Sequence, residues 1–521
     1  MSRVAMQRAV QRGALALLLC VLLLALLLYA AAATLALQTP DLLEVGEPWL
    51  VSAAWQPLVG GSIYAPVQAP PFLHHNYTPL GAVLQWPLLL LTGPSFLPGR
   101  VVTILATLLL AVVLARAVLA QGSSRTAAFV AGTLLFTTGI TFPWMLVGRV
   151  DTLAVLFSVS AFLVGVNNRR TFTAGALFVL LSVAAWSTKQ TAVAGPLAAL
   201  VCMFWRGART HALSLFLSWL CAVLGLAALL TWATDGEFWR HVVQFNARHT
   251  RDGMDVSGIG PQQLFEAVGI ALLVLLALPL VLRRTVGSGI WWVYGACAGA
   301  VALMGLSKSG SHVHHLLEVC AVLSVVAALG IDGVLLRWRR ADAAAAPVRT
   351  GSALRAWMFA ALLLLAAAGG LWGLRAGAWQ KLKHLHWLTM REDVVPHEVR
   401  EILRTSPRPA LLCSKLGSIA IEEGRAPWLD MADFRRLEMM GEFKPERDLV
   451  PLIQQRRFAL IGIPDFSADA AAELFDPRRF AGFSAALEEH YLPLRDATSG
   501  QPLSINDPKS RQRGTFWIPK S

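Results

Sequence analysis

Charged residues are scarce in this sequence, and their scarcity is uneven. Asp, Glu, Lys and Arg make up 15% of the 521 residues, whereas an average soluble protein has about 25%. Residues 1–375 contain 24 basic and 12 acidic residues, and residues 376–521 contain 21 and 20. This composition excludes a purely soluble, fibrous or disordered protein. It predicts a polytopic α-helical membrane domain over residues 1–375 and a soluble domain over residues 376–521.

Cysteine is also scarce, with six residues in the chain. Five of them lie in apolar runs, where a thiol usually behaves as a small buried hydrophobe. Cys413 is alone in the C-terminal domain, so that domain has no internal disulfide. No Cys or His spacing is typical of a zinc site. We therefore predict no metal centre and no cofactor, with a divalent metal left open as an alternative.

Two common enzyme signatures are missing from residues 376–521, namely a Gly-rich phosphate loop and a nucleophile elbow. The net charge of +13 does not indicate a nucleic-acid partner either. By the counts above, 24 minus 12 leaves twelve of the thirteen units in residues 1–375, among apolar runs. The basic residues there are better explained by membrane topology.

Long apolar runs are the main feature that the sequence does have. Eleven of them are predicted as membrane helices, although several are shorter than the usual length of about 20 residues. They cover residues 13–37, 101–120, 127–146, 150–167, 172–188, 190–205, 211–233, 262–282, 287–306, 313–336 and 354–374. The first run is longer than the apolar part of a signal peptide, about 7–15 residues. This favours a membrane helix, with a cleaved signal peptide as the alternative.

The arginines orient these helices. If residues 79–95 form a juxtamembrane or re-entrant helix, most of the arginines between Arg116 and Arg340 fall at cytoplasmic ends, as the positive-inside rule requires. The N-terminus is then cytoplasmic and the C-terminal domain extracytoplasmic. With this topology, ten of the twelve acidic residues before residue 376 lie at or near the outer face. We therefore expect any chemistry to occur there.

The first outer loop, residues 38–100, is rich in residues that could act on a substrate. It contains three carboxylates, two histidines and two tyrosines of interest: Asp41, Glu44, Glu47, His74, His75, Tyr64 and Tyr77. A loop held by proline and aromatic packing explains any one of them. The cluster favours a functional site.

Ionisable residues beside later apolar runs are the second group of candidates. They are Arg149, Asp151, Lys189, Lys308 and Glu318. Ion pairing within a loop or a snorkelling lysine is the simpler explanation for each. Ionisable groups at membrane depth are costly, however, and therefore often functional.

In order and spacing, these motifs resemble the bacterial GT-C glycosyltransferases, in the branch near protein O-mannosyltransferases and lipid A aminoarabinose transferases. The resemblance rests on five segments: Glu47 with Gly60-Gly61 and Tyr64, Tyr77-Thr-Pro-Leu80, Arg149-Val-Asp151, Lys189-Gln190, and Gly310-Ser311 with Leu317-Glu318. One departure concerns the acids. Members of that branch have an adjacent Asp-Glu pair in the first loop, whereas here the acids are spread over Asp41, Glu44 and Glu47.

The resemblance implies a glycosyltransferase of the bacterial inner membrane. Such an enzyme moves a sugar from a polyprenyl-phosphate-sugar donor to a lipid, glycan or protein acceptor at the outer face. The acceptor hydroxyl needs a carboxylate base, for which Glu47 is the first candidate, before Glu44 and Asp41, with Asp151 as an orienting group. The leaving phosphate needs cations, supplied by Arg149, Lys189 and Lys308. His74, His75, Tyr64, Tyr77 and Glu318 are expected to contact substrate.

Two other functions are compatible with the sequence. A transporter or flippase for a lipid-linked saccharide would also need charged residues at membrane depth, but the sequence shows no repeated half. A non-catalytic envelope-assembly protein with a degenerate site is the second alternative.

The C-terminal domain is predicted as a small α/β domain. Helices are expected near residues 395–405, 432–441, 447–457, 466–475 and 478–491, with parallel strands at 410–414 and 458–463. It could recognise the acceptor or act as a structural cap.

Overall fold

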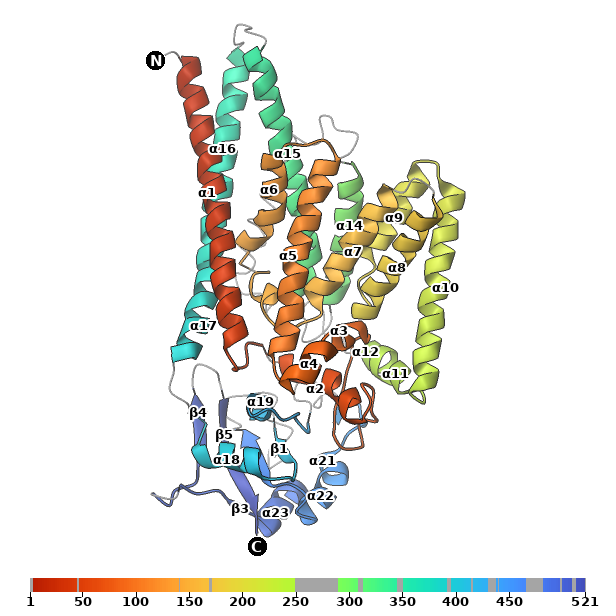
Figure 1. The fold of residues 1–521 in the computed structure, drawn as a ribbon, viewed down its shortest axis with the longest axis vertical. Coiled ribbons are helices and arrows are strands. Elements are labelled where there is room, and N and C mark those ends of the chain that lie inside the picture. The colour runs from red at the N-terminus through yellow and green to blue at the C-terminus, as the bar shows by residue number, and fades with distance from the viewer. Residues whose placement is uncertain are drawn as a thin grey trace.

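The computed structural model is an elongated bundle of helices with a small β-sheet at one end (Figure 1). It describes residues 3–44, 46–139, 141–167, 171–248, 289–307, 313–343, 350–390, 395–413, 416–429, 437–438, 440–464, 481–496, 499–507 and 512–520. The N-terminal end of α1 and the sheet lie at opposite ends of the molecule (Figure 1).

The bundle is built from ten apolar helices in the described ranges. They are α1 (Arg3–Gln38), α5 (Leu97–Ala120), α6 (Arg125–Thr133), α7 (Asp151–Val166), α8 (Phe172–Thr188), α9 (Ala194–Trp205), α10 (Arg209–Ala233), α14 (Gly289–Leu306), α15 (Leu317–Ala343) and α16 (Thr350–Gly373). α16 continues through the π-helix η7 (Leu374–Trp379) into α17 (Gln380–Met390). Helix α1 packs against α16 and α17, and α7 packs against α5, α8 and α9.

These helices coincide with ten of the eleven predicted runs. The eleventh run, 262–282, lies outside the described residues, and the total number of spans stays a prediction. In the run at 127–146 the α-helix ends at Thr133, and the short 3-10 helices η2 (Leu134–Thr137) and η3 (Pro143–Met145) follow. By length and hydropathy, five of the described helical stretches can cross a membrane, starting at Ala9, Leu97, Arg209, Gly289 and Val313.

The outer surfaces of the bundle helices are apolar. Leu27 on α1, Leu109 on α5 and Leu229 on α10 each expose more than half of their surface. The opposite faces of the same helices enter one large core that runs through the bundle. Helices that are apolar on all sides are typical of a membrane bundle, where lipid covers the outer faces.

The segment predicted as a juxtamembrane or re-entrant helix forms two short helices, α3 (Leu80–Val83) and α4 (Trp86–Thr92). Pro87 lies in the first turn of α4, where its missing N–H costs no hydrogen bond. Both helices pack against α2 (Glu47–Trp55), and α4 also contacts the start of α5. The first loop therefore folds over the end of the bundle nearest the sheet (Figure 1).

The sheet of the C-terminal part is mixed. Its strands are β1 (Ala410–Leu412), β2 (Leu460–Pro464), β3 (Tyr491–Pro493), β4 (Ser504–Asp507) and β5 (Gln512–Pro519). β1 and β2 pair in parallel, as predicted, with Leu411 opposite Ile461. β5 adds to β2 in antiparallel orientation and also pairs with β3 and β4. The sequence analysis did not predict these three antiparallel strands.

Both faces of this sheet are covered. Leu411 and Ile461 face one core, and Leu412 and Leu460 face the other, as expected from the two-residue period of strands. Helices α18 (His397–Thr405) and α19 (Gly417–Glu422) cover one face. The other is covered by α21 (Pro445–Asp448), α22 (Val450–Gln454) and α23 (Ala481–His490). The helices predicted at 432–441 and 466–475 fall largely or wholly outside the described residues.

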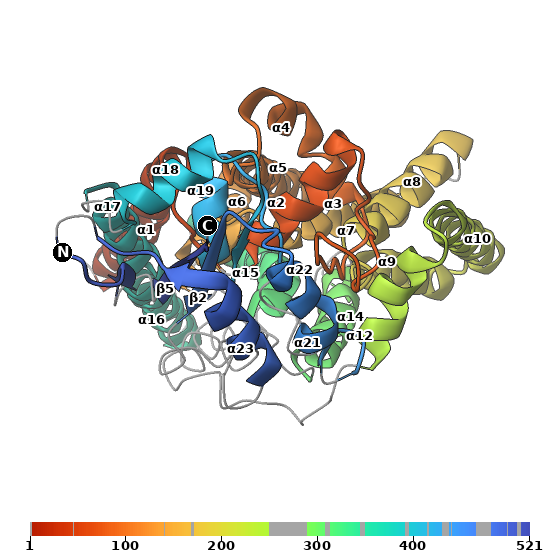
Figure 2. The same ribbon diagram turned by 90° about the horizontal axis from the view of Figure 1, so that it is seen from below.

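The C-terminal part is packed on the first loop. Phe72 is completely buried in the same core as Leu411, and its N–H donates to the Trp428 carbonyl at 3.0 Å. The segment after α10 forms α11 (Glu237–Trp239), the π-helix η4 (Arg240–Gln244) and α12 (Phe245–Ala247). Arg240 on this segment forms an ion pair of 3.0 Å with Glu442. Seen from the sheet end, α10 lies beyond the edge of the C-terminal part (Figure 2).

Candidate active site

Glu47 lies at the start of α2 in a completely buried ion pair. Its carboxylate accepts two hydrogen bonds from Arg100, Nε at 2.9 Å and Nη2 at 2.8 Å. The backbone N–H groups of Leu43 and Gly148 donate to the same carboxylate at 2.9 and 2.8 Å. A carboxylate has about four acceptor positions, so all of those of Glu47 are in use.

The partner of Glu47 is equally saturated. The remaining N–H groups of Arg100 donate to the carbonyls of Ala36, Thr39 and Asp41 at 2.6–2.9 Å. Arg100 therefore ties the end of α1 and the acidic segment of the first loop to the start of α5. Gly148 can approach this site because Gly99 lies against it, and a Cβ at Gly148 would lie 3.2 Å from the Gly99 Cα.

The environment of Glu47 favours its charged form. Burial by itself would raise the pKa of the carboxyl, but the Arg100 guanidinium and the two backbone N–H groups outweigh it and hold the pKa below the usual value. A carboxylate with a lowered pKa and no free acceptor position is a poor proton acceptor. The geometry thus favours a structural contribution of Glu47, which is the first candidate base from the sequence.

A second cluster brings together three of the predicted residues from different elements. Asp151 opens α7, where a carboxylate is favoured by the helix dipole. Lys189 follows the last residue of α8, and its Nζ lies 2.6 Å from Asp151 Oδ1. Arg149 Nε lies 3.5 Å from Asp151 Oδ2. All three side chains are at least nine-tenths buried.

Arg149 also reaches the first loop. Its Nη1 forms an ion pair of 3.2 Å with Glu44 Oε2, and its Nη2 donates to the Tyr77 hydroxyl at 3.0 Å. The guanidinium carbon lies 5.6 Å from the Trp49 and Trp144 rings and 5.8 Å from the Tyr77 ring. These cation–π contacts and ion pairs fix the guanidinium in one position.

Glu44 is the most accessible carboxylate of this group. Its side chain is 16% exposed, against 2% for Asp151 and 1% for Glu47. The Gly46 N–H donates to Glu44 Oε2 at 2.8 Å. Asp41 is buried, and its Oδ2 accepts from Thr39 at 3.1 Å.

His74 and His75 lie in a neighbouring aromatic cluster with His241 and Tyr64. The backbone N–H of His75 donates to His241 Nδ1 at 3.1 Å, and His241 Nε2 lies 2.9 Å from the Ala65 carbonyl. Because Nδ1 accepts and Nε2 donates, the proton of the neutral His241 ring is on Nε2. Burial, with help from His74, lowers the pKa of His75 to about 3. The ring of His75 is therefore neutral at physiological pH. The Tyr64 hydroxyl donates to the Tyr77 carbonyl at 2.8 Å.

The remaining predicted residues lie elsewhere. Glu318 on α15 accepts hydrogen bonds from Ser158 at 2.6 Å and Tyr294 at 2.7 Å, so it joins α7, α14 and α15 inside the bundle. Lys308, with Gly310 and Ser311 of the same motif, lies outside the described residues. No group of three or more His, Cys, Asp or Glu side chains in the described ranges is arranged to hold a metal ion.

Three contributors to the site were not identified from the sequence. Arg100 follows the pair Pro98-Gly99 at the outer end of an apolar run. An arginine on the outer side of the membrane is uncommon, and this was a usable signal. His314 Nε2 lies 3.7 Å from Asp151 Oδ1. Lys381 on α17 reaches the Leu43 carbonyl at 3.4 Å. Only the tertiary fold brings Lys381 to the acidic loop.

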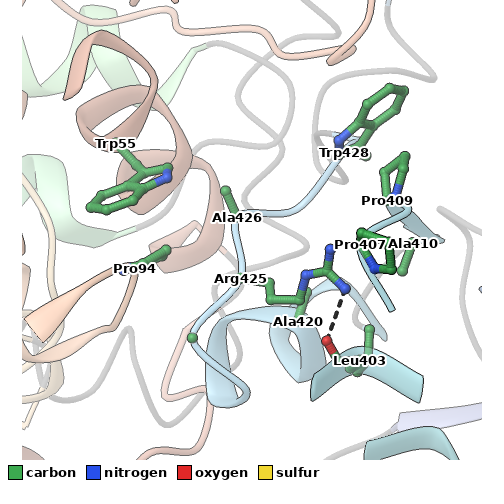
Figure 3. A pocket seen from close by; sticks show the side chains of 11 residues that line it. Trp55, Pro94, Leu403, Pro407, Pro409, Ala410, Ala420, Arg425, Ala426 and Trp428 are labelled. Atoms are coloured by element: carbon green, nitrogen blue, oxygen red, sulfur yellow. Dashed lines mark hydrogen bonds between the residues drawn. The ribbon is translucent and has the colours of Figure 1, made fainter. Parts of the chain in front are cut away.

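A cavity of about 380 Å³ lies away from these carboxylates, between the first loop and the C-terminal part. Trp55 and Pro94 form one wall, and Trp428 lies on the side of the C-terminal part (Figure 3). Among the described residues that line it, Arg425 is the one with a charge, and its guanidinium donates to the carbonyls of Leu403, Ser406 and Arg408. This described lining therefore offers no group suited to proton transfer.

No protein-family model and no curated protein matches the chain. Among solved structures it is similar to ArnT from Cupriavidus metallidurans in the apo state, with a TM-score of 0.60, 13% identity and coverage of 94% of this chain and 97% of that one. For the same protein bound to undecaprenyl phosphate the TM-score is 0.60, with 11% identity and coverage of 96% and 97%. A weaker match is AglB, the oligosaccharyltransferase of Archaeoglobus fulgidus, with a TM-score of 0.43, 13% identity and coverage of 92% and 73%. The chain thus has the fold of ArnT, and the predicted helical bundle is confirmed in its coarse architecture.

Proposed function

We propose that this protein is a membrane glycosyltransferase that transfers a sugar from a polyprenyl-phosphate-linked donor to a hydroxyl acceptor. The observation that carries the proposal is the convergence of Arg149, Asp151 and Lys189 with Glu44 at the end of an apolar bundle. The structural neighbour ArnT, a lipid A aminoarabinose transferase, has been crystallised with undecaprenyl phosphate. That ligand combines a long apolar tail with one phosphate group.

The arrangement suits a lipid-linked donor. The exposed leucines of the bundle provide contact with lipid, so a polyprenyl chain can approach from the bilayer. The phosphate would meet Arg149 and Lys189 where the bundle ends. Both cations are already buried and oriented, and such preorganised charges stabilise a group that gains negative charge in the transition state. Arginine also binds phosphate through two parallel N–H groups.

The reaction that we propose is a substitution at the anomeric carbon. The acceptor oxygen forms a bond to that carbon, while the bond between the carbon and the phosphate oxygen breaks. The lipid phosphate leaves with the bonding electrons beside Arg149 and Lys189. The acceptor proton passes to a carboxylate of the first loop, which acts as general base and contributes typically 10²–10⁴-fold to the rate.

We also propose a location and a division of the chain. The protein would be a multi-pass protein of the bacterial inner membrane with its N-terminus cytoplasmic, and the site and the C-terminal part would face outward. Residues 1–375 would carry the chemistry. Residues 376–521 would cap the first loop, since Phe72 and Glu442 join the two parts.

The test is an assay of the purified protein in detergent with radiolabelled polyprenyl-phosphate sugars. We expect sugar transfer or donor hydrolysis, with a loss of about 100-fold or more in Arg149→Ala and Lys189→Ala. Arg209→Ala, which removes an exposed arginine at the far end of α10, is the matched control. Turnover in detergent would exclude the transporter function, because no transport occurs there. Absence of turnover with every donor would contradict the proposal and favour the non-catalytic alternative.

A further inference from the structure

The four carboxylates Asp41, Glu44, Glu47 and Asp151 differ in how their acceptor positions are used. Those of Glu47 are filled by Arg100 and two backbone N–H groups. Both oxygens of Asp151 face cations, Lys189 on one side and Arg149 on the other. Asp41 is 8% exposed and its Oδ2 is bonded to Thr39. Glu44 uses Oε2 for Gly46 and Arg149, while no described residue donates a hydrogen bond to its Oε1.

Gly46 explains how Glu44 reaches this position. The backbone of Gly46 has φ −88° and ψ −9°, which any residue can adopt, so glycine is not required by the backbone. The requirement is spatial. A Cβ at residue 46 would overlap Arg149 Nη1 and lie 2.8 Å from Glu44 Oε2 and 2.7 Å from Trp49 Nε1. The space that a side chain at position 46 would fill is therefore taken by the contact between Glu44 and Arg149.

Trp49 provides an independent indication that a ligand binds here. Its side chain is buried, and its indole N–H lies beside the same space at Gly46 but donates to no acceptor among the described residues. Buried N–H donors are nearly always hydrogen-bonded. An oxygen of a bound phosphate or sugar next to Glu44 and Arg149 would supply the missing acceptor.

From these three observations we infer that Glu44 is the general base of the proposed transfer and that Gly46 is the residue that makes room for it. This inference rests on the proposed function. The acceptor O–H gives its proton to Glu44 Oε1 as the acceptor oxygen bonds to the anomeric carbon, and the lipid phosphate leaves with the electron pair. Once neutral, Glu44 no longer offsets the positive charge of Arg149, so the oriented guanidinium stabilises the phosphate more strongly as the phosphate gains charge.

The test moves the carboxylate instead of only removing it. Glu44→Gln keeps the shape of the side chain and removes the base, so we expect transfer to fall 10²–10⁴-fold. A second variant, Glu44→Asp, keeps a carboxylate at this position but draws it back by one methylene group. We expect Glu44→Asp to transfer at least about tenfold faster than Glu44→Gln. Gly46→Ala, whose Cβ would overlap Arg149 Nη1, should transfer more slowly than the wild type. Asp235→Asn, at an exposed acid near the end of α10, is the matched control.

A third variant separates a base from a structural carboxylate. In Glu44→Ala, added formate can enter the vacated space and accept the proton, so we expect transfer to rise with formate concentration. The wild type and Asp235→Asn should not respond. Donor binding, measured with the polyprenyl phosphate alone, should change less than threefold in Glu44→Gln.

The outcomes distinguish this inference from the proposed function. If wild-type protein transfers sugar and Glu44→Gln does so at the same rate, Glu44 is not the base although the enzyme function stands. The same conclusion follows if Glu44→Gln is inactive but Glu44→Asp is equally inactive and formate does not restore activity to correctly folded Glu44→Ala. If wild-type protein has no activity with any donor, the proposed function itself fails.

Discussion

Arg100 and Glu47 form a bidentate ion pair in which both side chains are essentially fully buried, at 0% and 1% exposure. All five N–H groups of Arg100 and all acceptor positions of Glu47 have protein partners. The pair joins α1, the acidic loop, α2 and α5 at the edge of the proposed site. Its first consequence is that it holds Glu44, three residues before Glu47, within reach of Arg149.

We expect either single substitution in this pair to destabilise the protein. Glu47→Gln or Arg100→Met leaves an unpaired buried charge, which typically costs about 3–5 kcal/mol. The double variant should be less destabilised than the sum of the two. Thermal unfolding of the purified variants in detergent measures this, with Arg209→Ala as control. Additive effects would show that the two residues do not act as a pair.

The pair also predicts a pH dependence at the acidic end. The pKa of Glu47 is lower in the folded protein than its usual value of 4.5. The contribution of its charge to the free energy of unfolding is therefore fully present above pH 4.5. It is lost as the pH falls through the lowered pKa. The difference in melting temperature between wild type and Glu47→Gln should therefore shrink below about pH 4.5. A difference that stays constant from pH 7 to pH 3 would contradict this.

Lys381 predicts a pH dependence in the basic range. Burial lowers its pKa from 10.5 to about 8, against the attraction of Glu47 and Glu44. The unfolded chain binds more protons than the folded one between these two values, so stability should rise with pH from about 8 to about 10.5. Lys381→Met should lack this rise. Melting curves of both proteins at several pH values are the measurement, and parallel curves would exclude the effect.

Arg149→Lys tests whether charge alone suffices at the phosphate site. Lysine keeps the positive charge but cannot contact Glu44, Tyr77 and Asp151 at once, as the guanidinium does. We expect transfer to fall at least about tenfold, mainly in kcat, because the misplaced charge stabilises the leaving phosphate less. Steady-state kinetics with a polyprenyl-phosphate sugar give the comparison. Wild-type kcat in this variant would mean that only the net charge matters.

Much of the architecture follows from local sequence. Apolar runs such as 211–233 correspond to helices because a bilayer-length apolar segment satisfies its backbone internally only as a helix. Strands β1 and β2 were also predictable, since short buried apolar runs flanked by helical segments favour parallel pairing. The antiparallel strand β5 was missed, since its residues carry no clear alternating pattern and its pairing partner β2 lies some fifty residues earlier.

Part of the membership of the candidate site was predictable from the sequence, but the contacts that distinguish its residues were not. Composition and position placed Glu44, Glu47, Arg149, Asp151 and Lys189 together near one face, because charged groups beside apolar runs must gather where water or partners are available. Which carboxylate is saturated and which keeps a free oxygen depends on Arg100, on the N–H groups of Leu43 and Gly148, and on the space left at Gly46. These are contacts between segments far apart in the chain. The sequence alone therefore determined which chemical groups the protein has near this face. Only the tertiary structure decided that the acceptor positions of Glu47 are filled while no described residue donates to Glu44 Oε1, because these contacts join segments far apart in the chain.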